Sequence, residues 1–323
     1  MVGSLLISGM LLYAAWYGVK ILKGWDIHSG SEQQLSLERR TYLISTMMIY
    51  AFGFQLLSLF LFIYTVDHLS TLFVGAMCAA GSLNVNAFGY PTILLKITNF
   101  LLAGVWLIFN YVDNQAYDYP LIKKKYALLM IIVPFIVIET CIQASYFLSL
   151  SPNVITSCCG TLFSASDQGV TSSLFALPLP LMESIFYSSM ATTLILGVYY
   201  YRRLKYGYLF SISSTATFVI SIIALISFLC LYFYELPTHH CPFCILQKEY
   251  GFVGYPLYLA LLGGAVPGMG LTAVLRCNRI KSLAEVVPTI QRGLGLMTVL
   301  SYAVFMVIVT GAMIFSNLSL KGY

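Results

Sequence analysis

Residues 239–250, HHCPFCILQKEY, contain two cysteines at a spacing that thiol chemistry uses. Two residues separate Cys241 from Cys244, so a helix that begins there would place both thiols on one turn. The N-terminus of such a helix stabilises a thiolate and makes the cysteine a better nucleophile. Pro242 would preset the first helical turn. The pattern therefore favours thiol–disulfide exchange at a redox-active centre.

Two other interpretations of this pair stay open. Either His239 or His240 could join the two thiolates as ligands of zinc or copper. The pair could also form a static disulfide that clips a loop in an oxidising compartment. A c-type haem needs a histidine directly after the second cysteine. Ile245 occupies that position, so the haem interpretation fails.

A second thiol pair, Cys158 and Cys159, lies in residues 156–184, TSCCGTLFSASDQGVTSSLFALPLPLMES. Adjacent cysteines can form a vicinal disulfide. They can also act separately, with one accepting electrons from a partner and the other passing them on. Cys78, in a segment rich in small residues, is expected to be a spare thiol in a capping or re-entrant segment.

The elements that must position these cysteines are membrane helices. The chain has 323 residues, of which 59% are hydrophobic and 9% are charged. In soluble domains, about a quarter of all residues are charged. Apolar segments of about 20 residues can span a bilayer. Inside lipid, a single segment can satisfy the hydrogen bonds of its backbone N–H and C=O groups only as a helix. Such segments are residues 2–22, 41–65, 91–112, 125–149, 173–200, 207–235, 253–275 and 293–316. The sequence predicts an all-α polytopic membrane protein with about eight transmembrane helices.

The basic residues indicate the orientation of these helices. Alternate loops on one side carry 14 of the 17 lysines and arginines, and the exceptions are Lys96, Lys248 and Lys321. Because lysine and arginine favour the cytoplasmic side, both termini should be extracytoplasmic. We expect a cytoplasmic (inner) membrane protein whose cysteine site faces the extracytoplasmic side, where disulfides persist. Five of the eight cysteines fall in the outward loops: Cys78, Cys158, Cys159, Cys241 and Cys244.

A short internal similarity suggests a duplication. GYPTILL at residues 89–95 and GYPLYLALL at residues 254–262 each open an inward-running helix, 10 to 13 residues after a cysteine. A parallel four-helix repeat would explain this arrangement, as in other repeat-built membrane proteins. Chance similarity is the alternative.

The segment CGTLFSAS, Cys159–Ser166, followed by LFALPLPL from Leu174, resembles the vitamin K epoxide reductase family. In that family, a four-helix bundle carries loop cysteines after its first helix and a Cys-x-x-Cys at its fourth. The fourth to seventh predicted spans reproduce that order. CPFCILQK is similar to the Cys-x-x-Cys-x-x-[Gln/Glu]-Arg segment of the bacterial disulfide-bond oxidase, with Lys248 in place of the arginine. The family's loop cysteines are separated by several residues, so Cys78 is a candidate for the missing position.

The resemblance implies a thiol:quinone oxidoreductase, which forms disulfides by passing electrons from extracytoplasmic thiols to ubiquinone or menaquinone. Electrons would pass through Cys158 and Cys159 to Cys241 and Cys244. The residues that it places near the quinone are Ser164, Gln247 and Lys248. The resemblance covers residues 125–276, which would form the four-helix bundle. Residues 1–124 would then form a three-helix region, possibly a degenerate repeat, and residues 277–323 a C-terminal helix.

The expected partners are the lipid bilayer, an extracytoplasmic thioredoxin-like protein and a larger membrane complex, with no nucleic acid. A different class of function stays open. The chain could be a non-enzymatic integral subunit of a respiratory or metal-handling assembly, with structural disulfides or a copper site.

Two carboxylates, Glu139 and Glu183, lie within predicted spans, each about 15 Å from the outer end at 1.5 Å per residue. An ionisable residue at that depth is a candidate for function, here proton transfer to or from the quinone site. The alternatives are a protonated glutamate hydrogen-bonded to a neighbouring helix, or a transporter whose path both glutamates line.

Overall fold

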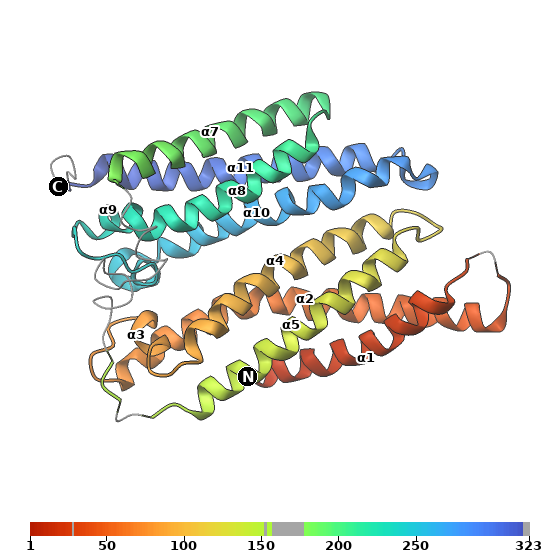
Figure 1. Ribbon diagram of the computed structural model, residues 1–323, viewed down its shortest axis with the longest axis horizontal. Helices are drawn as coiled ribbons and strands as arrows, with labels where there is room; N and C mark the ends of the chain where they lie inside the picture. Colours follow the sequence, from red (N-terminus) through yellow and green to blue (C-terminus); the bar gives the residue numbers. More distant parts are fainter. Residues whose placement is uncertain (28, 152–153, 157–177, 319–323) are drawn as a thin grey trace. The chain divides into compact units, whose positions relative to one another are not determined.

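The computed structural model describes residues 1–27, 29–151, 154–156 and 178–318, and these residues are helical without a β-strand (Figure 1). Eight helices among them are long and apolar enough to cross a membrane. This confirms the predicted all-α class and the predicted number of spans, because long apolar segments can satisfy their backbone only as helices.

The chain divides into two compact units. Unit 1 contains Met1–Thr65, Asn86–Ser151 and Arg276–Ile290, and unit 2 contains Val66–Val85, Pro152–Leu275 and Gln291–Tyr323. This division differs from the expected segments 1–124, 125–276 and 277–323. The helix expected to open the second bundle belongs to unit 1, since it packs against the first and third long helices.

The long helices of unit 1 are α1 (Val2–Gly24), α2 (Glu32–Leu69, as far as Thr65), α4 (Gly89–Asp113) and α5 (Ile122–Leu148). Helix α5 packs against both α1 and α4. The core between the helices is apolar and includes Phe52 and Trp106, whose ring centroids are 4.8 Å apart. Two short 3₁₀ helices, η5 (Arg276–Arg279) and η6 (Lys281–Leu283), complete the unit.

The long helices of unit 2 are α7 (Leu179–Arg203), α8 (Gly207–Ala224), α10 (Gly254–Leu275) and most of α11 (Val287–Phe315). Helix α8 continues through a π-helical turn, η2 (Leu225–Leu229), into α9 (Cys230–Tyr234), and it packs against α7 and α10. The shorter elements are η1 (Ser70–Leu72), α3 (Ala79–Leu83), η3 (Cys244–Leu246) and η4 (Lys248–Tyr250).

The two GYP sequences open helices as predicted. Helix α4 begins at Gly89 and α10 begins at Gly254. In the part of the chain that the structure describes, each is the third long helix of its unit. That placement is the one a parallel four-helix duplication predicts.

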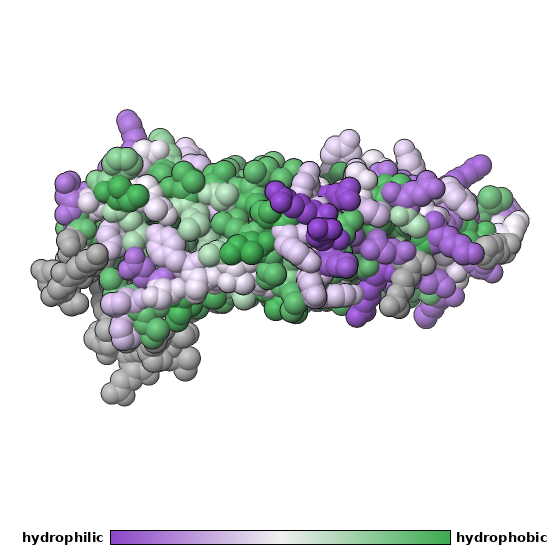
Figure 2. Space-filling view, turned by 90° about the horizontal axis from the view of Figure 1, so that it is seen from above, coloured by the Kyte–Doolittle hydropathy of each residue, from purple (hydrophilic) through white to green (hydrophobic). Residues whose placement is uncertain are grey.

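Large hydrophobic side chains are exposed along the long helices, among them Leu6 of α1, Tyr50 of α2, Ile195 of α7 and Val307 of α11. Figure 2 shows a face with a broad hydrophobic area in one half, while most of its hydrophilic residues gather in the other half. Exposed apolar surface is unfavourable in water and suits a bilayer. The chain is thus a multi-pass membrane protein by the length and surface of its helices.

Close packing of α10 depends on Gly268. A Cβ atom there would lie 2.0 Å from Ser214 Oγ of α8, and small residues permit such close helix contacts in membranes. Gly268→Ala should therefore lower the free energy of unfolding by about 1–3 kcal/mol through overpacking, measured as a lower thermal midpoint in detergent. Gly311→Ala is the matched control, because nothing lies within 4 Å of its Cβ position. Equal midpoints for the two variants would contradict this packing.

Candidate functional site

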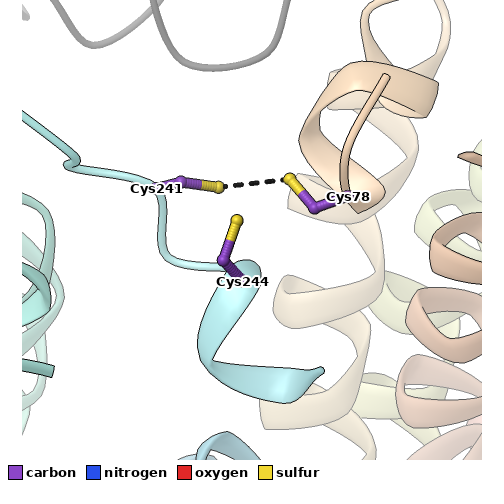
Figure 3. A group of neighbouring side chains, drawn as sticks. All are labelled: Cys78, Cys241 and Cys244. Atoms are coloured by element: carbon purple, nitrogen blue, oxygen red, sulfur yellow. Dashed lines mark hydrogen bonds between the residues drawn. The ribbon is translucent and has the colours of Figure 1, made fainter. Parts of the chain in front are cut away.

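Three cysteine side chains from two distant segments converge in unit 2 (Figure 3). Cys78 directly precedes α3, Cys241 lies in the turn before η3, and Cys244 is the first residue of η3. The Sγ atoms of Cys78 and Cys241 are 3.5 Å apart. All three Sγ atoms lie within 4.8 Å of one another, and all three residues are buried. The 3.5 Å separation is about 1.5 Å longer than a disulfide bond, so a small movement would join these sulfurs.

The turn that carries Cys241 and Cys244 is not the start of a membrane helix, which corrects the expectation from sequence. Cys244 opens η3, a 3₁₀ helix of three residues, and α10 begins ten residues later at Gly254. The chain is extended at Gln247, after η3 has ended, and it turns again where Gly251 and Phe252 adopt φ angles of +63° and +57°. A helix of three residues supplies little dipole, so thiolate stabilisation must come from other groups.

Among the described residues, Cys78 is the cysteine that contacts Cys241. The exchange partners expected for Cys241 are Cys158 and Cys159, and these residues and Ser164 lie outside the described residues. Cys78, expected to be a spare thiol, is the cysteine in contact with Cys241. The short similarity between the segments before α4 and α10 is the sequence signal for this pairing, since each of these helices follows a cysteine.

Hydrogen bonds of the Asp67 carboxylate and the Gln247 amide join the Cys78 segment to the Cys241–Cys244 segment. Asp67 Oδ1 accepts hydrogen bonds from the backbone N–H of Ala79 at 3.0 Å and from Gln247 Nε2 at 3.1 Å. Gln247 Nε2 also donates to the Met77 carbonyl at 2.8 Å. These bonds hold the residues on both sides of Cys78. Sequence reasoning missed Asp67. Its assignment of Gln247 to quinone binding stays a prediction, and the structure shows that Gln247 also joins the two cysteine segments.

The other side of this segment is held by Thr156. Its N–H donates to the Val74 carbonyl at 3.0 Å, and its hydroxyl donates to the Gly81 carbonyl at 2.9 Å. Gly75 permits this approach, because its φ is +88° and a Cβ atom there would lie 2.1 Å from the Thr156 carbonyl oxygen. A side chain at position 75 would push the two segments apart.

Two tyrosines hold the backbone of the Cys241–Cys244 turn. The Tyr234 hydroxyl donates to the Cys241 carbonyl at 2.5 Å and accepts the N–H of Ile245 at 2.9 Å. The Tyr258 hydroxyl donates to the Pro242 carbonyl at 2.5 Å. The turn is thus fixed by side chains from α9 and α10 instead of by a helix of its own.

Removing the Tyr234 hydroxyl should loosen this turn. Tyr234→Phe removes the hydroxyl that bonds the Cys241 carbonyl and the Ile245 N–H, and loss of buried hydrogen bonds costs about 1–3 kcal/mol. We expect a lower thermal midpoint and a smaller yield of the Cys78–Cys241 disulfide under mild oxidation, measured by mass spectrometry of the cross-linked peptides. Tyr250→Phe is the control, because it keeps the ring contact with Tyr234, at 4.7 Å between centroids. An unchanged yield in Tyr234→Phe would contradict this role.

His239 and His240 contact neighbouring residues of unit 2. His240 Nδ1 lies 2.9 Å from the Ile226 carbonyl, and the His239 ring packs edge-on against Tyr234. Among the described residues, the group with metal-ligand geometry contains three cysteines and no histidine. The metal interpretation therefore changes from histidine plus two thiolates to three thiolates.

The remaining predicted residues are spread over both units. Lys248 is exposed in η4. Glu183 is partly exposed on α7 in unit 2, and Glu139 is fully buried on α5 in unit 1. Glu139 forms an ion pair with Lys96, one of the three lysines that depart from the charge pattern.

Three neighbouring thiols support two kinds of chemistry. A thiolate can attack a disulfide formed by the other two sulfurs, and three thiolates can hold zinc or monovalent copper. No protein-family model, curated protein or solved structure matches this chain.

Proposed function

We propose that the protein is a membrane thiol:quinone oxidoreductase whose exchange centre consists of Cys78, Cys241 and Cys244. The observation that supports this most is the 3.5 Å contact between the Sγ atoms of Cys78 and Cys241, beside the third thiol. Thiol–disulfide exchange requires an attacking sulfur next to a disulfide and a third sulfur that can leave. These three residues supply all of these parts.

The overall reaction balances in two steps. A dithiol of a partner protein is oxidised to a disulfide while the Cys241–Cys244 disulfide is reduced to two thiols, with transfer of two electrons and two protons. Oxidation of the two thiols by a membrane quinone then restores the disulfide and yields the quinol. Ubiquinone and menaquinone both suit this role.

Cys78 would move the disulfide within the centre. Attack of its thiolate on Sγ of Cys241 forms a Cys78–Cys241 bond, breaks the Cys241–Cys244 bond and releases Cys244 as a thiolate. This exchange leaves the oxidation state of the protein unchanged. A partner dithiol that then reduces the Cys78–Cys241 bond leaves Cys241 and Cys244 as the two thiols that the quinone oxidises. Cys244 would react with the quinone first, and Lys248 could stabilise a reduced quinone anion.

The charge pattern of the loops supports an extracytoplasmic position for this centre, at the surface of the cytoplasmic membrane. A thioredoxin-like protein of that compartment is the proposed dithiol partner. Cys158 and Cys159 are the proposed carriers between the partner and the exchange centre.

Disulfide mapping tests the proposal directly. Thiols of the purified full chain would be blocked with an alkylating reagent before and after incubation with quinone, and the disulfide-linked peptides would be identified by mass spectrometry. We expect quinone to convert the reduced centre into a mixture of Cys241–Cys244 and Cys78–Cys241 disulfides, and a dithiol to reverse the change. Thiols that stay reduced with quinone would overturn the proposal.

A metal site is the second candidate, because the three buried sulfurs lie within 4.8 Å of one another. Zinc binds thiolates at about 2.3 Å, which corresponds to sulfur separations of about 3.8 Å in a tetrahedral site. Small adjustments would bring the three sulfurs to that geometry. In this case the chain would be a subunit of a metal-handling or respiratory assembly.

Metal analysis separates the two candidates. The protein would be purified without chelators, and its copper and zinc would be measured for the unaltered chain, for Cys78→Ser and for Cys141→Ser, whose cysteine is exposed. Stoichiometric metal that is lost only in Cys78→Ser would favour the metal site. Metal-free protein with quinone-dependent disulfides would favour the oxidoreductase.

A further inference from the structure

Unit 1 contains a buried polar cluster between α2, α4 and α5. Lys96 Nζ lies 2.7 Å from Glu139 Oε1 and donates to Ser58 Oγ at 2.8 Å. The other carboxylate oxygen of Glu139 accepts hydrogen bonds from Gln55 Nε2 at 2.6 Å and from Asn99 Nδ2 at 2.5 Å. All five residues are buried, and both charges are within helices that are apolar enough to cross a membrane.

Stability alone does not explain this cluster. Replacing a buried ion pair by apolar residues of similar volume is often neutral or stabilising. The Asn99 side chain also leaves its Oδ1 buried without a partner among the described residues. An unpaired buried acceptor costs about 1–3 kcal/mol. Ionisable residues retained at such a cost inside a membrane protein point to function.

A cavity of about 120 Å³ reaches this cluster. Ser58, which accepts the hydrogen bond of Lys96, is part of its wall, and so is Gln143, one turn along α5 from Glu139. A polar cavity needs only about 10–15 Å³ of such volume to hold a water molecule. Water in this cavity could therefore reach Ser58, which contacts Lys96 directly and lies one hydrogen bond away from the ion pair.

We propose that Glu139 is a proton-binding site that is loaded through this cavity and controlled by Lys96. A hydronium ion in the cavity gives its proton to the Glu139 carboxylate, which becomes a neutral carboxylic acid, and a water molecule remains. Lys96 stays an ammonium ion bonded to Ser58. The cluster changes its net charge from zero to +1, so the neutral and loaded states differ in their electrostatics.

The Asn99 amide has the groups needed for both states. With Glu139 ionised, Asn99 Nδ2 donates to the carboxylate and Oδ1 has no partner among the described residues. Rotation of the amide by half a turn would present Oδ1 to the new carboxylic acid O–H. The unpaired acceptor would then gain a donor, which offsets part of the cost of protonating Glu139.

The surroundings of the pair contain few other charges. In the described contacts, Lys96 and Glu139 are the charged members of this cluster, and α1 contributes the hydroxyls of Ser4 and Ser8 to Gln143 and Thr140 of α5. The other titratable residues on this part of α5 are Cys141, which is exposed, and Tyr146, which packs against Phe62.

A second buried ion pair provides a control. Lys125 Nζ lies 2.9 Å from Asp113 Oδ2 and donates to Asn110 Oδ1 at 3.1 Å, while Asp113 Oδ1 accepts the N–H of Leu121 at 2.8 Å. These residues join the end of α4 to the start of α5, and they are not part of the cavity wall. We expect this pair to stay ionised.

A hydrophobic carbodiimide, which reacts with protonated carboxyl groups buried in membranes, tests the proposal on the unaltered full chain. The labelling reaction would be run at a series of pH values from about 5 to about 9, and the labelled peptides would be identified by mass spectrometry. Labelling of Glu139 should fall as the pH rises, because only the protonated carboxyl group reacts, while Asp113 should stay unlabelled. Equal, pH-independent labelling of the two residues, or none at either, would overturn the proposal.

Infrared difference spectra provide a second measurement. Acidification of the membrane-reconstituted chain should produce the band of a protonated carboxyl group, and this band should be absent in Glu139→Gln and retained in Asp113→Asn. A band that is unchanged in Glu139→Gln would overturn the proposal, as would a transition that follows sodium concentration instead of pH.

Discussion

Cys244→Ser should lower quinone-dependent thiol oxidation by roughly 10³-fold or more, since loss of a reacting nucleophile has effects of this size. A serine hydroxyl cannot form the disulfide that the quinone regenerates. The measurement is the rate at which reconstituted protein and quinone oxidise a dithiol substrate. The structure should be preserved, because serine is similar in size to cysteine.

Variants of the other cysteines make this result specific. Cys241→Ser should cause a loss of the same size, and Cys78→Ser should also slow turnover, because Cys78 contacts Cys241. Cys141→Ser, in an exposed position on α5, should leave the rate unchanged. Full activity in Cys244→Ser would rule out the exchange centre, whatever the other variants show.

Lys96→Met should lower the free energy of unfolding by about 3–5 kcal/mol, because it leaves the Glu139 carboxylate buried without its cation. Thermal unfolding in detergent at neutral pH measures this loss. The loss should shrink at acidic pH, since protonation of Glu139 removes the unpaired charge.

The double variant Lys96→Met with Glu139→Gln identifies the cause. It removes both charges, so it should recover most of the stability that Lys96→Met loses. If the double variant were as unstable as the sum of the two single variants, the effect would come from packing and not from the ion pair. Lys125→Met provides the comparison with the second buried pair.

Much of the fold was predictable because hydropathy is a local property. Each segment of about 20 apolar residues forms a helix whatever its neighbours are, so the eight spans follow from the sequence. The helix starts at Gly89 and Gly254 were also predictable from the repeated GYP motif. The grouping of the helices was not, because many pairs of apolar helices can pack together and the sequence does not say which do.

The candidate site was predictable in part for a similar reason. The spacing of Cys241 and Cys244 identifies a thiol pair by itself, and the charge pattern predicts an outward position that stays a prediction. The contact with Cys78 depends on the hydrogen bonds of Asp67 and Gln247, which join segments far apart in the chain.

Lys96 shows the same limit. In the sequence it is an exception to the charge pattern of the loops, whereas the structure places it inside α4 as the partner of Glu139. The helices, the thiol pair and the intramembrane carboxylates can be read from the chain alone, since composition and spacing carry these features. The contacts of Lys96 with Glu139 and of Cys78 with Cys241 cannot be predicted from the chain alone, because long-range contacts depend on how the helices and loops pack in three dimensions.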